Sequence, residues 1–454
     1  MGGGDWLNDR LGYRDWIRKS FGRPLPDGAS WIRSLVFALI LLFVFEGLTG
    51  FLLSLSYSPS TETAHASVEY TMNETLIGGF VRNLHFHAAS LILVVITLIG
   101  LCCFYQGAYK GGNEASWILG VILLNLVFAY TISGFLLPWD QNAFWGTKVR
   151  TSIMGSTPLV GPMVQKVVQG GTDLGNLTLT RFYAGHFFLI PLVTVGVYFV
   201  YRGIKKHIWK RKMVGVESPE TLPTYWPHQA ARDVTMGCLV LAVLFGMSFA
   251  VPIELGPKAD PLLNYPARPE WFFRWLYQLL KYFQGSAQII GTIVIPGLMG
   301  VILILIPFLD RSEKPGFGQK KLLLTFLLAI ALFCTGLTSI AYYHDLETGH
   351  YEEVELWQAK ADPEFDVDTF YKSECFECHG STGSGLLEAT PDFGDPDFWS
   401  GSRADVYLIK AILEGIPNET LPEDERMPGY QDKINADQAL ALIEFKLKKF
   451  PEEE

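Results

Sequence analysis

The chain has 454 residues, of which 49% are hydrophobic and 14% aromatic, and its formal net charge is −10. This composition is too apolar for an ordinary soluble domain and indicates a membrane protein. Basic residues cluster before residue 34 and at 202–212, whereas the tail from 345 onward is acidic, a distribution that argues against nucleic-acid binding.

Seven apolar runs are long enough to cross a bilayer. They are 31–55, 84–106, 116–137, 182–203, 233–251, 288–309 and 322–343. Residues 1–30 lack the apolar centre of a signal peptide, so we expect the first run to be an uncleaved span. The sequence therefore predicts an all-α, multi-pass membrane protein.

The basic residues of three segments predict the orientation of these spans. Lys and Arg are concentrated before the first span, after the fourth span and after the sixth span. All three segments fall on one side if the spans alternate, and that side is expected to be the cytoplasm. The N-terminus is then cytoplasmic, and seven crossings place the C-terminal part on the outer, periplasmic side of the cell inner membrane.

Two long loops, 138–181 and 252–287, fall on the outer face in this topology. The first contains a stretch, 162–168, that could form a short surface helix. The second contains Pro269, which suits the first turn of a short helix, and Glu270, which would lie near the positive end of that helix. Loops of this length without internal structure are uncommon, so both are interpreted as functional covers.

Polar and acidic stretches divide the chain into five parts. These are a cytoplasmic segment (1–30), a four-helix domain (31–212), a three-helix domain (213–344), an acidic linker (345–365) and a small soluble all-α domain (366–454).

The soluble domain carries one cysteine motif, Cys375-Phe376-Glu377-Cys378-His379. Cys-x-x-Cys-His is the covalent attachment pattern of a c-type haem, in which both thiols bond the porphyrin and the histidine binds the iron. A zinc site would need further ligands, and no Cys or His follows His379. A redox dithiol would be expected in a βαβ context, which this region lacks. The four other cysteines lie in apolar runs and are interpreted as buried thiols.

A second axial ligand for this haem c is expected at Met427. It is the only methionine after the attachment motif. Thioether ligation raises the reduction potential of a haem, so this centre is expected to accept electrons. The alternative is an exposed methionine without a ligand role.

A second cofactor is suggested by histidines inside the spans. Only His85, His87 and His186 lie in apolar runs, and each is near the outer start of its helix. Two imidazoles from two helices at equal depth can hold one haem b near the outer side. Spacing alone does not choose between His85 and His87, and polar histidines that pack helices together are the alternative.

Small residues lie at the same outer level as these histidines. Gly50 ends the first span and Gly134 ends the third, where missing side chains would let a planar macrocycle approach. Glu46 in the first span is a candidate functional acid, because intramembrane acids are costly. A side chain satisfied by a neighbouring helix is an equal alternative for Glu46.

Five motifs carry a resemblance to a known family. They are Thr49-Gly50, Arg82-Asn83-Leu84-His85, Trp117-x-x-Gly120…Gly134-x-x-x-Pro138-Trp139-Asp140-Gln141, Thr180-Arg181-Phe182-Tyr183-Ala184-Gly185-His186, and Ala259-Asp260-Pro261…Pro269-Glu270-Trp271-Phe272. With them the chain resembles the cytochrome b family of quinol–cytochrome c oxidoreductases (bc-type complexes). More closely, it resembles a four-helix cytochrome b fused to a subunit IV-like part, here followed by a cytochrome c domain.

The resemblance implies roles for several residues. His85 and His186 match the ligands of the outer haem b, and Arg82 would lie near a haem propionate. Glu270 matches the family's proton acceptor from quinol, although Phe272 stands where the family has tyrosine. A carboxylate that only caps a helix is the alternative for Glu270.

Departures from the family pattern concern a second, inner haem. The family's inner ligands fall at Ile99 and Tyr201, an inner glycine falls at Phe37, and Ser34 replaces the cysteine that tethers an extra haem in some relatives. Gly120 retains its family identity. We therefore expect the inner haem b to be lost, unless an inner cofactor is held in another way.

The expected function is that of an electron-transfer subunit in a bc-type quinol oxidoreductase. It would oxidise membrane quinol at an outer-face site and use one haem b and one haem c to deliver electrons to an external cytochrome c or similar acceptor. A Rieske iron–sulfur protein and a homodimeric complex are the implied partners. The alternatives are a non-catalytic membrane anchor and a quinone reductase that runs in the reverse direction.

Overall fold

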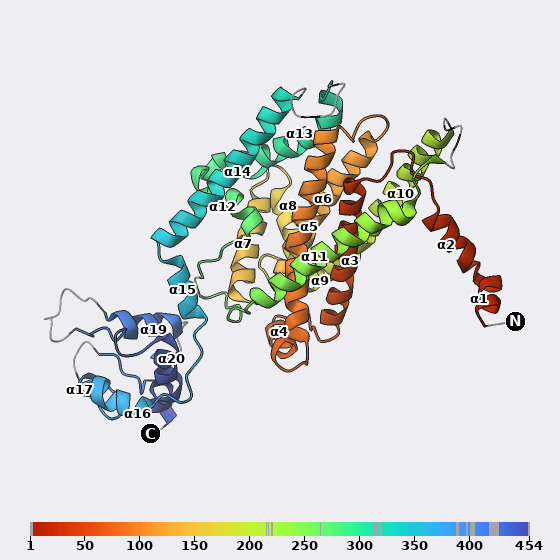
Figure 1. The fold of residues 1–454 in the computed structure, drawn as a ribbon. Helices are drawn as coiled ribbons and strands as arrows, with labels where there is room; N and C mark the ends of the chain where they lie inside the picture. Colours follow the sequence, from red (N-terminus) through yellow and green to blue (C-terminus); the bar gives the residue numbers. More distant parts are fainter. Residues whose placement is uncertain are drawn as a thin grey trace. The chain divides into compact units, whose positions relative to one another are not determined.

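The computed structural model describes residues 3–214, 216, 218, 221–263, 265–312, 316, 320–386, 390–395, 398–399, 405–416 and 426–452. Helices dominate this part of the chain, and no β-strand occurs in it. The only β-type pairs in the described residues are two isolated bridges, Pro24 with Thr224 and Asp140 with Lys258. Figure 1 shows the order of the helices along the chain.

Seven helical segments of the described residues are long and apolar enough to cross a membrane. They are α3 (Trp31–Ser54), α5 (Gly78–Gln106), α6 (Glu114–Phe135), α9–η1–α10 (Asn176–Val214), η3–α11 (Tyr225–Ala250), η6–α13 (Ile290–Leu309) and α14 (Lys321–Glu347). The predicted seven-span, all-α fold is confirmed. The fourth segment is much longer than its predicted run 182–203, because Lys, Arg and Trp residues after the apolar part continue the helix in water.

The chain forms two compact units. The first comprises residues 1–139, 147–255 and 275–337, and the second comprises 140–146, 256–274 and 338–454. The domain boundaries predicted from the sequence remain predictions.

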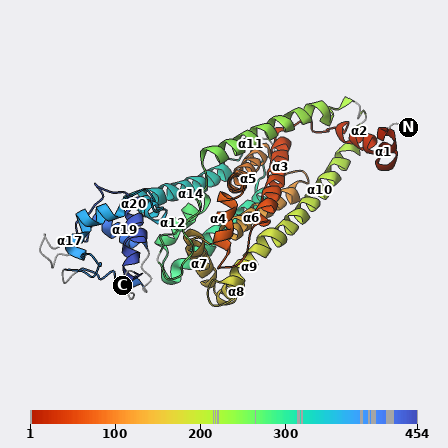
Figure 2. The same ribbon diagram turned by 90° about the horizontal axis from the view of Figure 1, so that it is seen from below.

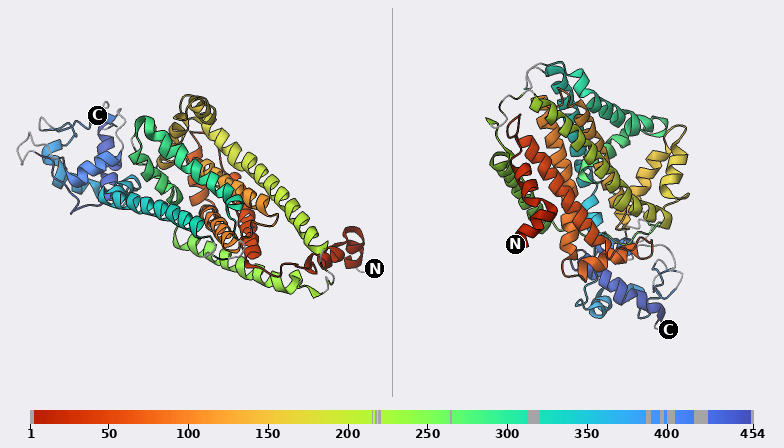
Figure 3. Two further views of the ribbon diagram at one scale, coloured as in Figure 1. Left: turned by 90° about the horizontal axis from the view of Figure 1, so that it is seen from above. Right: turned by 90° about the vertical axis from the view of Figure 1, so that its right-hand side faces the viewer.

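In the first unit, α3 packs against α5 and α11, and α6 packs against α10 and α13. Figure 2 shows α10 leaning away from α3 toward the short N-terminal helices α1 (Gly3–Leu11) and α2 (Tyr13–Phe21). The same divergence is visible from above in the left panel of Figure 3. The helix α5 contacts both α3 and α6.

Most apolar side chains of the spans lie on the surface of the protein. On η1 (Gly185–Leu189) and α10 (Ile190–Val214), Phe188 is 64% exposed and Leu192 is 71% exposed. Apolar surface of this extent is what hydrocarbon chains cover in a membrane protein. The faces that pack against neighbouring helices are also mainly apolar, with Leu39 and Leu42 of α3 and Ile92 of α5 buried.

The segments between the spans contain the short helices α4 (Ala64–Asn73), α7 (Gln141–Gly155), α8 (Gly161–Gln169), η4 (Trp271–Phe273), α12 (Arg274–Tyr282) and η5 (Gly285–Ala287). The surface helix predicted at 162–168 is confirmed as α8. The expectation that Pro269 lies in a first helical turn is wrong, because helix η4 starts at Trp271. Glu270 is the preceding cap residue, with ψ of 157°, an extended conformation.

The second unit includes the C-terminal region. Its described helices are α15 (His350–Trp357), α16 (Val367–Phe370), η8 (Tyr371–Cys375), α17 (Phe376–His379), α19 (Asp405–Glu414), α20 (Ala436–Phe445) and η10 (Leu447–Glu452). One apolar core joins α19, α20 and η8, with Tyr371, Ile409 and Ile443 almost fully buried. The predicted linker 345–365 is partly helical, since α15 occupies its centre.

Candidate cofactor sites

Two imidazoles from different helices meet in the first unit. His85 lies on α5 and His186 lies on η1, a five-residue π-helical turn between α9 (Asn176–Ala184) and α10. Their ring centroids are 6.1 Å apart, and the ring planes make an angle of 72°. A π-helical turn widens a helix locally and is frequent at functional sites. The structure thus brings together two histidines that are separated by a hundred residues of sequence.

Each of these imidazoles lies directly against a glycine of another helix. A Cβ atom at Gly50 would be 3.1 Å from Cε1 of His85, and a Cβ at Gly134 would be 2.7 Å from Cε1 of His186. Any side chain at Gly134 would therefore displace the ring. The space left by each predicted glycine is therefore taken up by an imidazole ring. The sequence had predicted that this space admits the macrocycle.

A hydroxyl group precedes each glycine and holds the same ring nitrogen. Oγ1 of Thr49 is 3.0 Å from Nδ1 of His85, and Oγ of Ser133 is 3.1 Å from Nδ1 of His186. Each hydroxyl donates its own proton to the carbonyl four residues back in its helix, at 2.7 Å. Each hydroxyl can therefore accept from Nδ1–H, which leaves Nε2 as the metal-binding nitrogen.

The two imidazoles differ in one further neighbour. Oε2 of Glu46 is 2.7 Å from Nδ1 of His85. At the corresponding place beside His186, three residues before the hydroxyl, Tyr130 packs its ring edge-to-face at 5.7 Å. One imidazole therefore has an acid as a partner, whereas the other has an aromatic ring.

The neighbouring residues His87 and Arg82 bond to backbone groups. His87 is 4% exposed, and its Nε2 is 2.8 Å from the carbonyl oxygen of Val251. Arg82 donates to the carbonyls of Ile253 at 2.7 Å and Glu254 at 3.3 Å. The ambiguity between His85 and His87 therefore has a geometric answer, since only His85 faces His186.

The imidazole pair fits an iron porphyrin. Two metal–imidazole bonds of about 2 Å on opposite sides of one iron place the ring centres roughly 6 Å apart. The observed spacing of 6.1 Å matches this value. Each imidazole of the pair has one glycine that leaves room for its ring and one hydroxyl that fixes its Nδ1.

At the other end of the bundle, the residues at the expected inner positions are packed with protein groups. Phe37 lies against Gly237 of α11, where a Cβ would be 3.2 Å from its ring. Ser34 donates to Asp233 at 2.8 Å, and Gln229 donates to the same carboxylate at 2.7 Å. All three of these polar side chains are buried. This part of the α3–α11 contact is therefore a closed helix interface.

In the second unit, the cysteine motif occupies the end of η8 and the four residues of α17. Cys375 and Cys378 are free thiols and half-buried. Burial raises the pKa of the Cys375 thiol to about 12, and the negative charge of the nearby Glu374 adds to this increase. An unmodified Cys375 is thus a neutral thiol at physiological pH.

His379 ends α17 and is 8% exposed. Its ring stacks on Phe393 at 4.7 Å with an angle of 23°. Gly380 follows with φ of +73°, a left-handed conformation that favours glycine. The chain then turns back, with the amide of Leu386 donating to the carbonyl of Cys378 at 2.7 Å.

Met427 packs against the same apolar core as Cys375. Its carbonyl accepts from the amide of Ile416 at 3.1 Å. This segment passes so close to Gly415 that a Cβ there would be 2.6 Å from the Met427 carbonyl oxygen. The fold thus fixes the Met427 backbone beside the end of α19 and half-buries its side chain.

The Glu270 segment is tied to a buried acid on both sides. Arg268 donates from Nε to Asp345 at 2.8 Å, and Arg274 forms a very short ion pair with the same carboxylate. Asp345 is 1% exposed. Burial lowers the pKa of the nearby His350 to about 4, and the positive charge of Arg268 adds to this decrease. The backbone around Glu270 is therefore anchored two residues before it and four residues after it.

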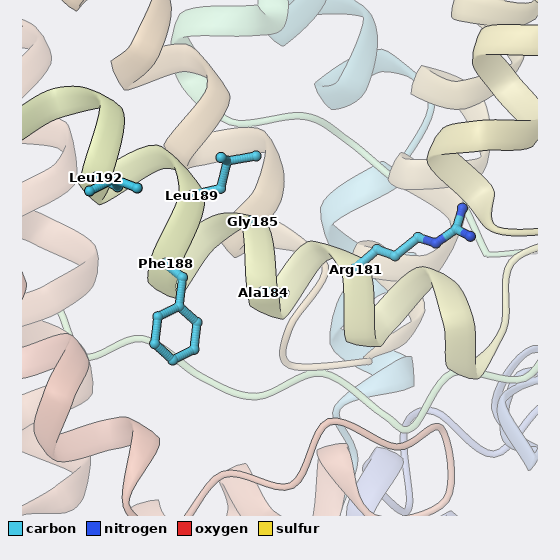
Figure 4. Close-up of a pocket in the computed structure, with 6 residues that line it drawn as sticks. All are labelled: Arg181, Ala184, Gly185, Phe188, Leu189 and Leu192. Atoms are coloured by element: carbon cyan, nitrogen blue, oxygen red, sulfur yellow. The ribbon is translucent and has the colours of Figure 1, made fainter. Parts of the chain in front are cut away.

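A shallow hollow of about 450 Å³ lies on the surface of the fourth span. It is lined by Arg181, Ala184, Gly185, Phe188, Leu189 and Leu192. Figure 4 shows these residues along one helical segment, with Arg181 at one end and Leu192 at the other. The hollow does not include His186 and belongs to the lipid-facing surface.

Sequence reasoning missed Ser133 and Tyr130, and it left the role of Glu46 open. A usable signal was present, because Glu46-x-x-Thr49-Gly50 and Tyr130-x-x-Ser133-Gly134 share the spacing of hydroxyl and glycine.

Two family models match the chain. Cytochrome b/b6/petB matches residues 21–204, and the C-terminal cytochrome b/b6/petD model matches residues 258–351. The matched regions end before Cys375. They include His85, His186 and Glu270.

Curated relatives and a solved structure agree with these models. The chain is 30% identical over 367 residues to cytochrome b of Rhodobacter capsulatus, covering 72% of this chain and 82% of the relative. It is 28% identical to cytochrome b/c1 of Bradyrhizobium diazoefficiens, of which it covers 49%. A chain of a hyperthermophilic respiratory Complex III has the same fold, with a TM-score of 0.64, 23% identity and coverage of 74% of this chain and 91% of that chain.

Proposed function

The chain belongs to the cytochrome b family and acts in electron transfer within a bc-type quinol oxidoreductase, and from this premise we propose that it oxidises membrane quinol at an outer-face site with one haem b and one covalent haem c. The observation that carries the proposal is the pair of imidazoles at 6.1 Å with a glycine against each ring.

His85 and His186 would hold the haem b. When bound there, the haem supplies a one-electron redox centre. The protein's part is to fix both rings: Gly50 and Gly134 leave room for them, while Thr49 and Ser133 accept their Nδ1 protons. Partners of this kind set ring orientation and ligand basicity in metal sites.

Cys375, Cys378 and His379 would hold the haem c, with Met427 as the second axial ligand. Bound in this way, the haem supplies a higher-potential centre that suits electron exit. The half-buried free thiols and the half-buried Met427, which packs against the same core as Cys375, support this assignment.

A single haem b is supported by the inner half of the bundle. The matching positions Ile99 and Tyr201 offer no imidazole.

Glu270 is proposed to accept a proton from quinol. A carboxylate suits general base catalysis if it lies within hydrogen-bond reach of the proton that it takes. Asp345 holds the flanking Arg268 and Arg274, which restricts the backbone on which Glu270 lies.

The membrane topology and the partners belong to the same proposal. The protein would lie in the cell inner membrane with its N-terminus in the cytoplasm and its haem c region outside. A Rieske iron–sulfur protein, an external cytochrome c or similar acceptor and a second copy of the chain would complete the complex.

The test is quinol-dependent reduction of haem c in the purified complex. Glu270→Gln should lower this rate about a hundredfold, which is the usual contribution of a general base. Glu254→Gln, in the exposed segment after α11, is the matched control and should leave the rate unchanged. Unchanged turnover in Glu270→Gln would remove Glu270 from the mechanism, and absence of quinol turnover in the unmodified complex would favour a non-catalytic anchor.

A further inference from the structure

Glu46 is an acid inside the first span, and its side chain contacts a proposed haem ligand, His85. We propose that Glu46 lowers the reduction potential of the haem b by accepting the Nδ1 proton of His85, so that this ligand is a stronger donor to iron than His186. The inference rests on the proposed assignment of His85 and His186 as the two axial ligands.

The contact between Glu46 and His85 is short and shielded from water. Oε2 of Glu46 is 2.7 Å from Nδ1 of His85, and the two side chains are 16% and 25% exposed. The other carboxylate oxygen, Oε1, is buried and has no hydrogen-bond partner among the described residues. The described contacts of this carboxylate are therefore directed at the imidazole.

The hydrogen-bond roles follow from the requirement of the metal. An imidazole that gives its Nε2 lone pair to iron carries its proton on Nδ1 and donates it. Thr49 donates its own proton to the carbonyl of Phe45, so both Thr49 and Glu46 act as acceptors toward His85. The charged acceptor is also the nearer one and makes the stronger hydrogen bond.

His186 provides an internal comparison. Its Nδ1 also meets a hydroxyl, Ser133, at 3.1 Å. At the position matching Glu46, however, the helix carries Tyr130, whose ring packs edge-to-face on the imidazole. The two ligands thus share a glycine and a hydroxyl, and the carboxylate is the difference between them.

The sign of the effect follows from electrostatics. A carboxylate that accepts a strong hydrogen bond from Nδ1–H draws the proton toward itself and makes the imidazole more basic. A more basic ligand stabilises the more positive iron oxidation state. Removal of water strengthens this interaction, because the local dielectric constant is low. The oxidised haem is stabilised, so the reduction potential falls.

The experiment is a redox titration of haem b in the full-length complex, followed at its α-band. Glu46→Gln keeps a hydrogen-bond acceptor and removes the charge. It should raise the midpoint potential so that the ferrous-to-ferric ratio at a fixed applied potential increases about tenfold, equivalent to about 59 mV for one electron. Glu254→Gln, which removes a carboxylate from the exposed segment after α11, should leave the potential unchanged.

Near-infrared magnetic circular dichroism of the unmodified oxidised protein gives a second readout that needs no substitution. The energy of the ligand-to-metal band reports how much imidazolate character an axial histidine has, and we expect a position displaced from that of two neutral imidazoles.

An unchanged midpoint potential in Glu46→Gln with haem b present, or a band at the neutral bis-imidazole position, would overturn this inference alone. If the unmodified protein contains no haem b, or if His85→Leu retains it, the proposed function fails and the inference fails with it.

Discussion

The two proposed haem sites are specified in opposite ways. The attachment motif of the haem c site lies within five consecutive residues, Cys375–His379. These residues belong to the end of η8 and to α17. The His85–His186 site is assembled from four helices: two supply the imidazoles, and two supply Gly50 and Gly134. The first site depends on covalent chemistry, whereas the second depends on helix packing.

This difference predicts how each site fails. A packing-dependent site is sensitive to single atoms added at the helix contact, because protein interiors do not yield freely. A covalent site tolerates changes around it but loses its cofactor attachment when a thiol is removed.

The largest effect is expected from removing an axial ligand of haem b or the two attachment thiols of haem c. His186→Leu should abolish haem b, because one imidazole cannot provide bis-histidine ligation, and should leave haem c in place. Cys375→Ala with Cys378→Ala should abolish covalent haem c and leave haem b. Absorption spectra of the reduced membranes, together with haem staining of denaturing gels, measure both. Loss of both haems from either variant would contradict the independence of the two sites.

An added methyl group at the glycines should give a graded loss of haem b. Gly134→Ala should lower the haem b content severalfold, since the new Cβ would lie 2.7 Å from His186. Gly50→Ala should have a milder effect, because the corresponding distance to His85 is 3.1 Å. Gly120→Ala, where a Cβ would meet no atom within 4 Å, is the matched control. Equal haem content in the Gly134 and Gly120 variants would show that the ring contact does not limit binding.

The smallest effect concerns pH and the buried His350. Its pKa is about 4 in the folded protein, against an ordinary value of 6.5. Between these values the unfolded chain binds more protons, so stability is lost as the pH falls from about 6.5 toward 4. The loss should be on the order of 1 kcal/mol, because the charges of Arg268, Arg274 and Asp345 around His350 are partly screened.

This pH effect is measured by thermal unfolding in detergent at pH 7 and pH 5. His350→Gln should reduce the difference in melting temperature between the two pH values, whereas His344→Gln, on the exposed end of α14, should not. An identical pH response in His350→Gln and the unmodified protein would contradict the assignment.

Sequence reasoning predicted the seven spans because apolar length is a local property. The cysteine motif was readable for the same reason. Sequence reasoning could not choose between His85 and His87 as the haem ligand, since both lie on one helix. Only the structure shows that Nε2 of His87 is hydrogen-bonded to the carbonyl oxygen of Val251. The sequence also could not predict the hydrogen-bond partners of the two Nδ1 atoms. Ser133 meets His186 and Glu46 meets His85 only when helices distant in sequence pack together.

The start of the helix after Glu270 was misplaced for a related reason. Pro269 is compatible with a first helical turn, but Arg268 is held by Asp345 and by Asn142, to whose side-chain oxygen its amide donates at 2.9 Å. These contacts accompany an extended backbone at Glu270, and the helix starts one residue later.

The most direct test of the account is the ratio of haem b to haem c in the purified protein, measured as pyridine haemochromes. Of the three histidines in the apolar runs, His87 is bonded to a backbone carbonyl, which leaves His85 and His186 as one pair of ligands. The account therefore predicts one haem b for each haem c. Two haem b groups for each haem c would contradict it.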